Sequence, residues 1–253
     1  GVVMLVLALL FRRMPGLSLA HLKCYAVTGT TGFAIPYLVV AIVLGHGLSS
    51  GILSIIIALA PMMTYLGAVI FRLEKAGWLR FLGLFVGMAG IVLIVAPDSS
   101  LPSPDLVVWV LVAMIVPLGY AATTISAALM RPPAMDSLTF SAGFFIAPVP
   151  ILFIAMIASG DMWVFSGGFG DAEWALLLSA LVQGLGIYLF LELVVLMGPV
   201  FFTTVNFITP VTGILWGMAF FDERLSSWVL IALAPLFLGL FFVILPRKTR
   251  QVV

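Results

Sequence analysis

The chain has 253 residues, of which 64% are hydrophobic and 8% are charged, and its mean hydropathy is +1.31. Soluble domains have about 45–50% apolar and about 25% charged residues, so this composition excludes a soluble domain and predicts an all-α polytopic membrane protein. The net charge of +1 says nothing about partners, and we expect no nucleic-acid partner; the single cysteine, Cys24, excludes an intrachain disulfide.

The chain opens with about eleven apolar residues, GVVMLVLALLF, which Arg12 and Arg13 follow. A spanning helix needs about twenty apolar residues, and a signal peptide carries its basic residues before the apolar run. We therefore interpret this run as the back half of a helix. We expect the first helix and part of the second to be missing from this chain.

Eight longer apolar runs follow, each long enough to cross a hydrocarbon core of about 30 Å when tilt and local thinning are allowed. The runs are continuous rather than alternating, which favours helices over strands. Glycine and proline punctuate the connectors, as at Gly198-Pro199. The predicted spans are 24–44, 50–71, 79–96, 106–129, 138–158, 173–197, 199–221 and 227–245.

The basic residues predict the orientation of these spans. If residues 12–23 are cytoplasmic, ten of the eleven Lys and Arg residues fall on the cytoplasmic side, and only Arg224 falls outside. This distribution obeys the positive-inside rule. We therefore predict a multi-pass protein of the inner (plasma) membrane with a cytoplasmic C-terminus.

Segment 61–97 recurs at 210–246 with an offset of 149 positions and no gap. The chain has only four glutamates, and two of them coincide in this alignment, each directly before a basic residue. An internal repeat is the simplest interpretation. The identical pairs are Pro61–Pro210, Leu66–Leu215, Phe71–Phe220, Glu74–Glu223, Leu84–Leu233, Gly90–Gly239 and Pro97–Pro246.

Five predicted spans separate the Glu74 connector from the Glu223 connector, so the two copies cross the membrane in opposite directions. We predict an inverted repeat of two five-helix bundles, a ten-helix carrier fold, with repeats at 1–97 and 106–246. Many secondary transporters have this architecture, and their substrate site lies near the bilayer midplane between the halves.

These residues resemble the EamA-type family of the drug/metabolite transporter superfamily. A proline-containing helix ends in Glu-Lys or Glu-Arg, and a short connector and a glycine-bearing helix follow it, most clearly over 50–97 and 199–246. The resemblance implies ten helices with both termini cytoplasmic, and efflux of a small metabolite from a bacterial cytoplasm. The chain departs from the family by lacking the first helix.

Polar and small residues recur every three or four positions within the predicted spans, so they share helix faces. An unsatisfied polar group in the bilayer is costly, so these faces line a cavity or, alternatively, pack against other helices. The cavity candidates are Tyr120, Thr124, Gln183, Tyr188, Asn206 and Trp216. The residues assigned to helix packing are Gly83, Gly87, Gly90, Gly213 and Gly217.

Glu192 lies inside the predicted span 173–197, where a charge at the bilayer centre costs about 2.5–3.5 kcal/mol. It is a candidate proton or cation site; alternatively it reaches interfacial water or forms an ion pair. Glu74 and Glu223 lie at helix ends beside basic residues, which favours local ion pairs. No metal-ligand spacing and no phosphate loop occurs, so we expect no metal, no other cofactor and no ATP hydrolysis.

No Lys or Arg lies near the middle of a predicted span, which disfavours phosphate or sulfate substrates. We predict a secondary-active transporter of a small neutral, zwitterionic or amphipathic metabolite, embedded in the lipid bilayer and working as a monomer or a homodimer. The alternatives are a non-transporting scaffold or truncated pseudo-carrier and, less favoured, an intramembrane enzyme. An enzyme would need a nucleophile with a base, or paired carboxylates, at one depth.

Overall fold

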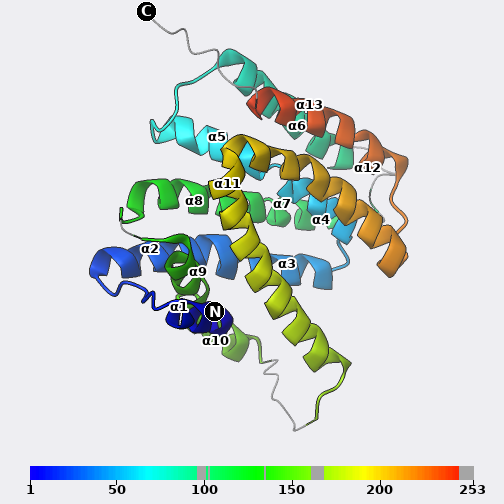
Figure 1. The fold of residues 1–253 in the computed structure, drawn as a ribbon. Helices are drawn as coiled ribbons and strands as arrows, with labels where there is room; N and C mark the ends of the chain where they lie inside the picture. The colour runs from blue at the N-terminus through cyan, green and yellow to red at the C-terminus, as the bar shows by residue number, and fades with distance from the viewer. Residues whose placement is uncertain (96–100, 102, 134, 161–167, 245–253) are drawn as a thin grey trace, which may run out of the picture. The chain divides into compact units, whose positions relative to one another are not determined.

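The structure is a computed structural model that describes residues 1–95, 101, 103–133, 135–160 and 168–244, except for the side chains of 188 and 190–207. The regular elements among these residues are all helices, and none of the described residues lies in a strand. The elements are α1 (Val2–Leu10), α2 (Leu19–Gly29), the π-helix η1 (Thr30–Ala34), α3 (Ile35–Gly45), α4 (Ser50–Ile57), α5 (Ala60–Ile70), α6 (Trp78–Val95), α7 (Leu106–Ala113), α8 (Ile115–Met130), α9 (Ser137–Ile146), α10 (Val149–Ser159), α11 (Asp171–Phe221), α12 (Ser227–Ile231) and α13 (Leu233–Ile244) (Figure 1).

Within the described residues, six helical stretches are long and apolar enough to cross a membrane. They agree with six of the predicted runs to within a few residues, so the chain is a multi-span membrane protein. The six stretches are Leu19–Gly45, Ser50–Ile70, Trp78–Val95, Leu106–Met130, Ser137–Ser159 and Ser227–Ile244.

The two remaining predicted runs both lie in α11, and the predicted connector at Gly198-Pro199 is wrong. α11 is one continuous helix of 51 residues. Proline removes only one backbone hydrogen bond and is tolerated in membrane helices, so Pro199 lies within the assigned helix.

Four of the six spans are interrupted by a short turn, and each interruption precedes a proline. A proline has no N–H to donate to the carbonyl four residues earlier, and its ring clashes with that carbonyl. The first segment of each of these spans ends four residues before the proline. The pairs are Ile57 and Pro61, Ala113 and Pro117, Ile146 and Pro150, and Ile231 and Pro235.

Pro36 has a different effect on the first span. Gly32 lies four residues before it, and here the helix widens into η1 instead of breaking. The N–H of Ile35 donates to the carbonyl of Thr30, five residues earlier, as in a π-helix. The span Leu19–Gly45 is therefore helical throughout but contains one wide turn.

The helices form two compact units. Unit 1 consists of Gly1–Leu38 and Thr123–Phe202, and unit 2 consists of Val39–Ala122 and Thr203–Val253. Each unit therefore contains residues from both predicted repeats.

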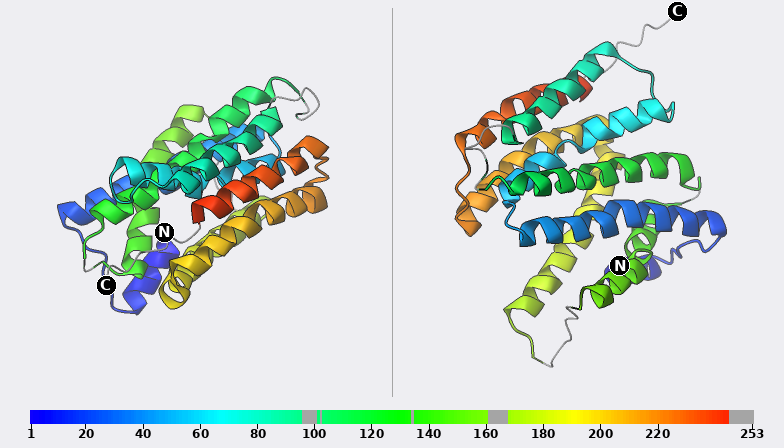
Figure 2. Two further views of the ribbon diagram at one scale, coloured as in Figure 1. Left: turned by 90° about the horizontal axis from the view of Figure 1, so that it is seen from above. Right: turned by 180° about the vertical axis from the view of Figure 1, so that it is seen from behind.

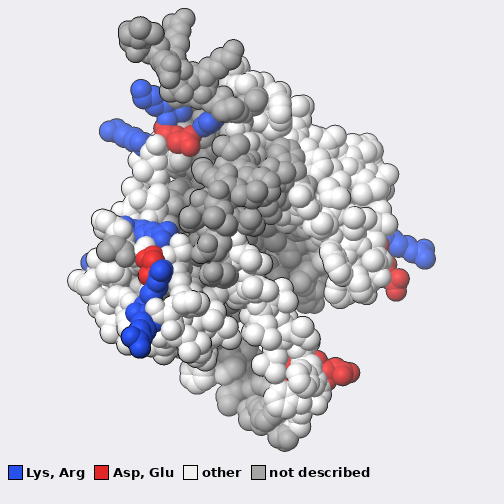
Figure 3. All heavy atoms as spheres, in the orientation of Figure 1, with Lys and Arg blue, Asp and Glu red and all other residues white. Residues whose placement is uncertain are grey.

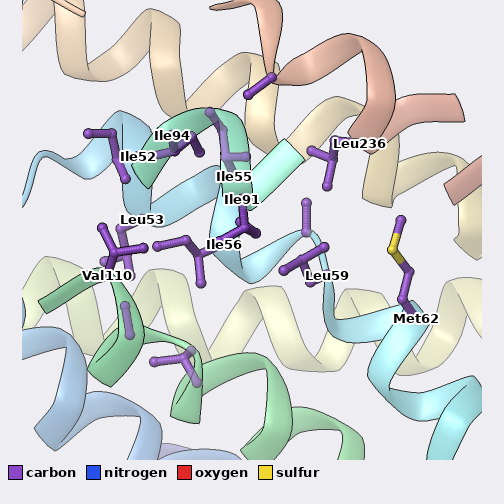
Figure 4. Close-up of a cluster of buried hydrophobic side chains, with 14 of the residues drawn as sticks. Ile52, Leu53, Ile55, Ile56, Leu59, Met62, Ile91, Ile94, Val110 and Leu236 are labelled. Carbon is purple, nitrogen blue, oxygen red and sulfur yellow. The ribbon is translucent and has the colours of Figure 1, made fainter. Parts of the chain in front are cut away.

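Unit 2 has a large apolar core, to which α4, α5, α6, α7 and α13 contribute (Figure 4). Its labelled side chains are β-branched or long aliphatic residues such as Ile56, Leu59 and Leu236, none of which is exposed. α6 and α13 lie side by side in both views of Figure 2. A Cβ on Gly83 would lie 2.6 Å from the carbonyl oxygen of Gly239, so only glycine allows these backbones to approach so closely.

Unit 1 is held together by α9, which packs against both α1 and α2. Met4 of α1 and Phe145 of α9 belong to one buried cluster. Cys24 and Tyr25 of α2 belong to a second cluster, with Met135. A Cβ on Gly143 would overlap the ring of Tyr25, so α2 and α9 are also in close contact.

Candidate functional site

Glu223, one of the two repeated glutamates, binds the first turn of α4 in unit 2. The backbone N–H of Ser50 donates to Oε1 of Glu223 at 2.6 Å, and the N–H of Gly51 donates to Oε2 at 3.0 Å. Ser49 completes the cap, since its Oγ accepts from the N–H of Ile52 at 3.2 Å. These N–H groups have no partner within the helix, and a carboxylate there also interacts favourably with the helix dipole. We expected a local ion pair for Glu223; its carboxylate instead binds backbone amides across the fold.

Gly217 leaves the space that Glu223 needs. A Cβ at this position would overlap Oε2 of Glu223 and lie 2.9 Å from Oγ of Ser50. That hydroxyl is buried and has no hydrogen-bond partner among the described residues. The site is thus a compact polar cluster at the start of α4, bounded by a glycine.

Glu74, the second repeated glutamate, has a different environment. It is exposed, follows the end of α5, and forms an ion pair with Arg80 in the first turn of α6. The guanidinium of Arg80 also lies over the ring of Tyr65, 5.4 Å from its centroid. For Glu74 the predicted local ion pair is therefore present.

The two glutamates lie at opposite ends of one span. Glu223 binds the amides that begin Ser50–Ile70, and Glu74 follows the residues that end it. The 21 residues of this span extend about 32 Å at about 1.5 Å per residue, which matches a hydrocarbon core of about 30 Å. The two copies of the repeated connector are thus separated by roughly the thickness of a membrane.

Between these ends, α4 contacts the C-terminal part of α11. Oγ of Ser54 donates to the carbonyl of Gly51 at 2.7 Å and to the carbonyl of Pro210 at 3.3 Å. A Cβ on Gly213 would overlap the Ser54 side chain. Two of the polar and small faces predicted from the sequence therefore pack directly on each other at this point.

In unit 1, hydroxyl groups gather at the wide turn η1. Oγ1 of Thr31 lies 2.7 Å from Oγ1 of Thr123 on α8, and it also donates to the carbonyl of Val27 at 2.9 Å. Gly32 fits tightly here, because a Cβ would lie 2.6 Å from Oγ1 of Thr123. π-Turns within α-helices are frequent at functional sites, so this cluster is a second candidate site.

Aromatic rings border the threonine pair. Phe33 lies 4.3 Å from Tyr37 and 5.1 Å from Phe145, measured between ring centroids. Phe144 packs edge-on against Phe33 at 6.3 Å. The wide turn thus combines hydroxyl groups with aromatic faces, a chemistry suited to neutral or amphipathic molecules.

The cavity candidates predicted from sequence are divided between the units. Tyr120, which packs against the unit 2 core, and Trp216 belong to unit 2. Trp216 is 59% exposed and stacks on Phe220 at 4.6 Å. Thr124, which is exposed, and Gln183, which is partly buried, belong to unit 1. The side chains of Tyr188, Glu192 and Asn206 lie outside the described residues.

Sequence reasoning missed Thr31 and Thr123. The prediction chose Thr124, the neighbour of the residue that bonds across to η1. The Thr-Thr-Gly sequence at 30–32, four residues ahead of Pro36, was the available signal. A widened turn four residues before a proline exposes small polar groups that would otherwise lie within a regular helix.

Comparison with protein families supports the sequence resemblance. Residues 1–96 match the model of the EamA-like transporter family, whose members are transporters and not enzymes. No curated protein matches the chain. Within the described residues no group of three His, Cys, Asp or Glu side chains could hold a metal ion. Residues 1–96 of this multi-span membrane chain are thus similar to the EamA-like transporter family.

Proposed function

We propose that the chain is a secondary-active transporter that exports a small metabolite by alternating access. The observation that carries this proposal is the placement of Glu74 and Glu223 at opposite ends of the span Ser50–Ile70. Two copies of one connector on opposite membrane faces are what an inverted repeat requires. The family match over residues 1–96 supports the same function.

The substrate class follows from the charges in the spans. Lys23 and Arg80 are the only basic residues in the six candidate spans, and both lie near a helix start. A phosphate or sulfate at midplane would therefore meet no cation from these spans. Small neutral, zwitterionic or amphipathic metabolites, such as amino-acid-like compounds or drugs, fit this environment.

Topology is the first test of this proposal. Cys24 is the only cysteine and is buried, so a Cys24→Ala background allows single cysteines to be introduced cleanly. Lys75→Cys and Arg224→Cys are then labelled with a membrane-impermeant maleimide in right-side-out and inverted vesicles. We expect Lys75→Cys to react only in inverted vesicles and Arg224→Cys only in right-side-out vesicles. Reaction of both from one side would end the inverted-repeat proposal.

Transport is the second test. The purified chain in proteoliposomes is assayed for counterflow of labelled amino acids, nucleosides and cationic dyes. Saturable exchange of at least one compound is expected. A folded protein with the predicted topology that exchanges none of them would favour the non-transporting scaffold.

Proton coupling through Glu192 is a separate hypothesis, based on its position within the predicted span 173–197. Glu192→Gln should abolish flux driven by a pH gradient while leaving exchange at equal pH intact. Glu173→Gln, at the start of the same helix, is the matched control. Unchanged pH-driven flux in Glu192→Gln would refute the coupling role.

A further inference from the structure

Four basic side chains lie in unit 1 where α1 and α8 end and where α2 and α9 begin. Arg12 and Arg13 follow α1, Lys23 lies early in α2, and Arg131 follows α8. Asp136 is the carboxylate of this cluster, and its ion pair with Arg13 joins the connector 11–18 to the start of α9. Figure 3 shows groups of blue atoms with small red patches at the left of the view.

Asp136 cannot neutralise the cluster, because it supplies one negative charge against four positive charges, and its oxygens are fixed at the start of α9. Oδ1 accepts from the N–H groups of Leu138 and Thr139 at 3.0 and 3.1 Å, and Oδ2 accepts from Oγ1 of Thr139 at 3.0 Å. Nη1 of Arg13 lies 3.7 Å away. With four cations and one carboxylate, the cluster keeps a net charge of +3.

Two of the cations have no protein partner among the described residues. Arg131 donates to the carbonyl of Met135 at 2.8 Å and lies over the ring of Phe140, and Arg13 faces Asp136. The side chains of Arg12 and Lys23, by contrast, are exposed and form no ion pair or hydrogen bond within the described residues. They are available to an external anion.

Exposed apolar side chains flank these cations along the same segment. They are Phe11, Met14, Leu17, Leu19 and Leu22, and Leu17 is 78% exposed. A soluble phosphate or a nucleic acid would leave this apolar surface in water. A lipid provides both a charged headgroup for the cations and acyl chains for the apolar residues.

We propose that Arg12 and Lys23, with the exposed apolar residues of 11–22, bind the headgroup phosphate of an anionic lipid in the cytoplasmic leaflet. Lys and Arg near an anionic membrane surface each add substantially to binding, and basic pockets at helix ends hold such headgroups. The inference does not depend on transport. It concerns only unit 1.

Cys24 provides the assay, because it is buried in unit 1 beside this cluster and reacts with a thiol dye only when the unit unfolds. The temperature at which Cys24 becomes reactive is measured for the full chain in detergent. Phosphatidylglycerol, phosphatidylcholine with the same acyl chains, or inorganic phosphate is added. We expect phosphatidylglycerol alone to raise this temperature. Native mass spectrometry then gives the apparent dissociation constant for phosphatidylglycerol.

Arg12→Gln/Lys23→Gln is the test variant, because neither side chain supports the fold through a described partner. It should bind phosphatidylglycerol more weakly by roughly fivefold for each cation removed. Phosphatidylglycerol should also no longer raise the temperature at which Cys24 becomes reactive in this variant. Arg12→Lys should retain both the binding and the rise in temperature. Arg224→Gln, which removes an exposed cation from unit 2, should behave like the unmodified chain.

Three results would overturn the proposal. Equal stabilisation by phosphatidylcholine would mean that the headgroup charge is not recognised. Equal stabilisation by inorganic phosphate would assign the site to a soluble anion. Full retention of the phosphatidylglycerol effect in the double variant, or its loss in Arg224→Gln, would place the binding elsewhere.

Discussion

Glu74 and Glu223 occupy equivalent positions in the two predicted repeats, and their backbone N–H groups donate to equivalent carbonyls. The N–H of Glu74 donates to the carbonyl of Ala68 at 3.1 Å, and the N–H of Glu223 donates to the carbonyl of Gly217 at 3.2 Å. Ala68 and Gly217 are themselves equivalent at the offset of 149. The two predicted copies therefore share this backbone hydrogen bond, while the two carboxylates take different partners.

Two neighbouring positions explain the difference. Arg80, the partner of Glu74, is replaced in the second copy by Val229, which is buried. Without this arginine, Glu223 turns to the free amides of α4, and Gly217 leaves room for it where the first copy has Ala68. The glutamate at this position of the predicted repeat thus forms an exposed ion pair in one copy and caps a helix in the other.

The largest expected effect comes from filling the space at Gly217. Gly217→Leu should displace Glu223 from α4 and overpack the contact, lowering the free energy of unfolding by about 3 kcal/mol. Chemical unfolding in mixed micelles, followed by circular dichroism, measures this free energy of unfolding. Gly186→Leu in the same helix, where a Cβ meets nothing within 4 Å, should change little. Equal decreases in the free energy of unfolding in both variants would contradict the claim that Gly217 leaves room for Glu223 at the start of α4.

Removal of the Glu223 carboxylate should have the next largest effect. Glu223→Ala leaves the amides of Ser50 and Gly51 without their partner and should cost about 2 kcal/mol, and Glu223→Gln should cost less. The same unfolding assay applies. Glu223 and Gly217 act through one contact. The free energy of unfolding of the double variant Gly217→Leu/Glu223→Ala should therefore fall by less than the sum of the decreases in the two single variants. Simple additivity would argue against a shared contact.

Asp136 extends the comparison to a helix cap in unit 1. Burial alone would raise the pKa of Asp136, but hydrogen bonds from Thr139 and Leu138, together with the charge of Arg13, outweigh it and lower the pKa below its usual range. Because the pKa of Asp136 is lower in the folded state than in the unfolded state, the ionised carboxylate stabilises unit 1 above about pH 4. This stabilisation is lost as the pH falls through the folded-state pKa.

Acidification from about pH 6 to about pH 3 should therefore remove part of the stability of unit 1, at most the roughly 1 kcal/mol that a helix N-cap contributes. Chemical unfolding followed by circular dichroism at each pH measures this loss, because a thiol dye reacts with the thiolate and would not report on unfolding at pH 3. Asp136→Asn should flatten this part of the pH profile. An unchanged profile would show that other carboxylates account for the acid sensitivity.

Glu74→Ala should have the smallest effect. Its ion pair with Arg80 is at the surface, where such pairs contribute about 0–1 kcal/mol and are screened by salt. The loss measured by chemical unfolding should shrink further at high ionic strength. A decrease in the free energy of unfolding as large as that of Glu223→Ala would show that the Glu74 ion pair stabilises the fold as much as the Glu223 cap does.

The spans and the repeated positions could be predicted from the sequence, because long apolar runs and a shared glutamate are local signals. The partner of Glu223 could not, since Ser50 lies 173 residues away and backbone amides carry no sequence signature. The helix interruptions were predictable in principle from the prolines. The continuous α11 was not, because Gly198-Pro199 is equally typical of a turn.

The candidate sites were less predictable than the spans. Small and polar residues every three or four positions mark a helix face, but they do not distinguish a cavity from a packed contact. Ser54 and Gly213 lie in a packed contact. Thr31 became significant only because the helix widens around it and brings its hydroxyl to Thr123.

The π-helix η1 also marks the place in the span Leu19–Gly45 where the helix can lose one residue. A π-turn accommodates one residue more than an α-turn, so deletion of Thr30 would leave the helix on either side in its present orientation. A deletion anywhere else in this span would rotate one end against the other by about 100°. Natural variation in the length of this span should therefore be concentrated at Thr30–Ala34.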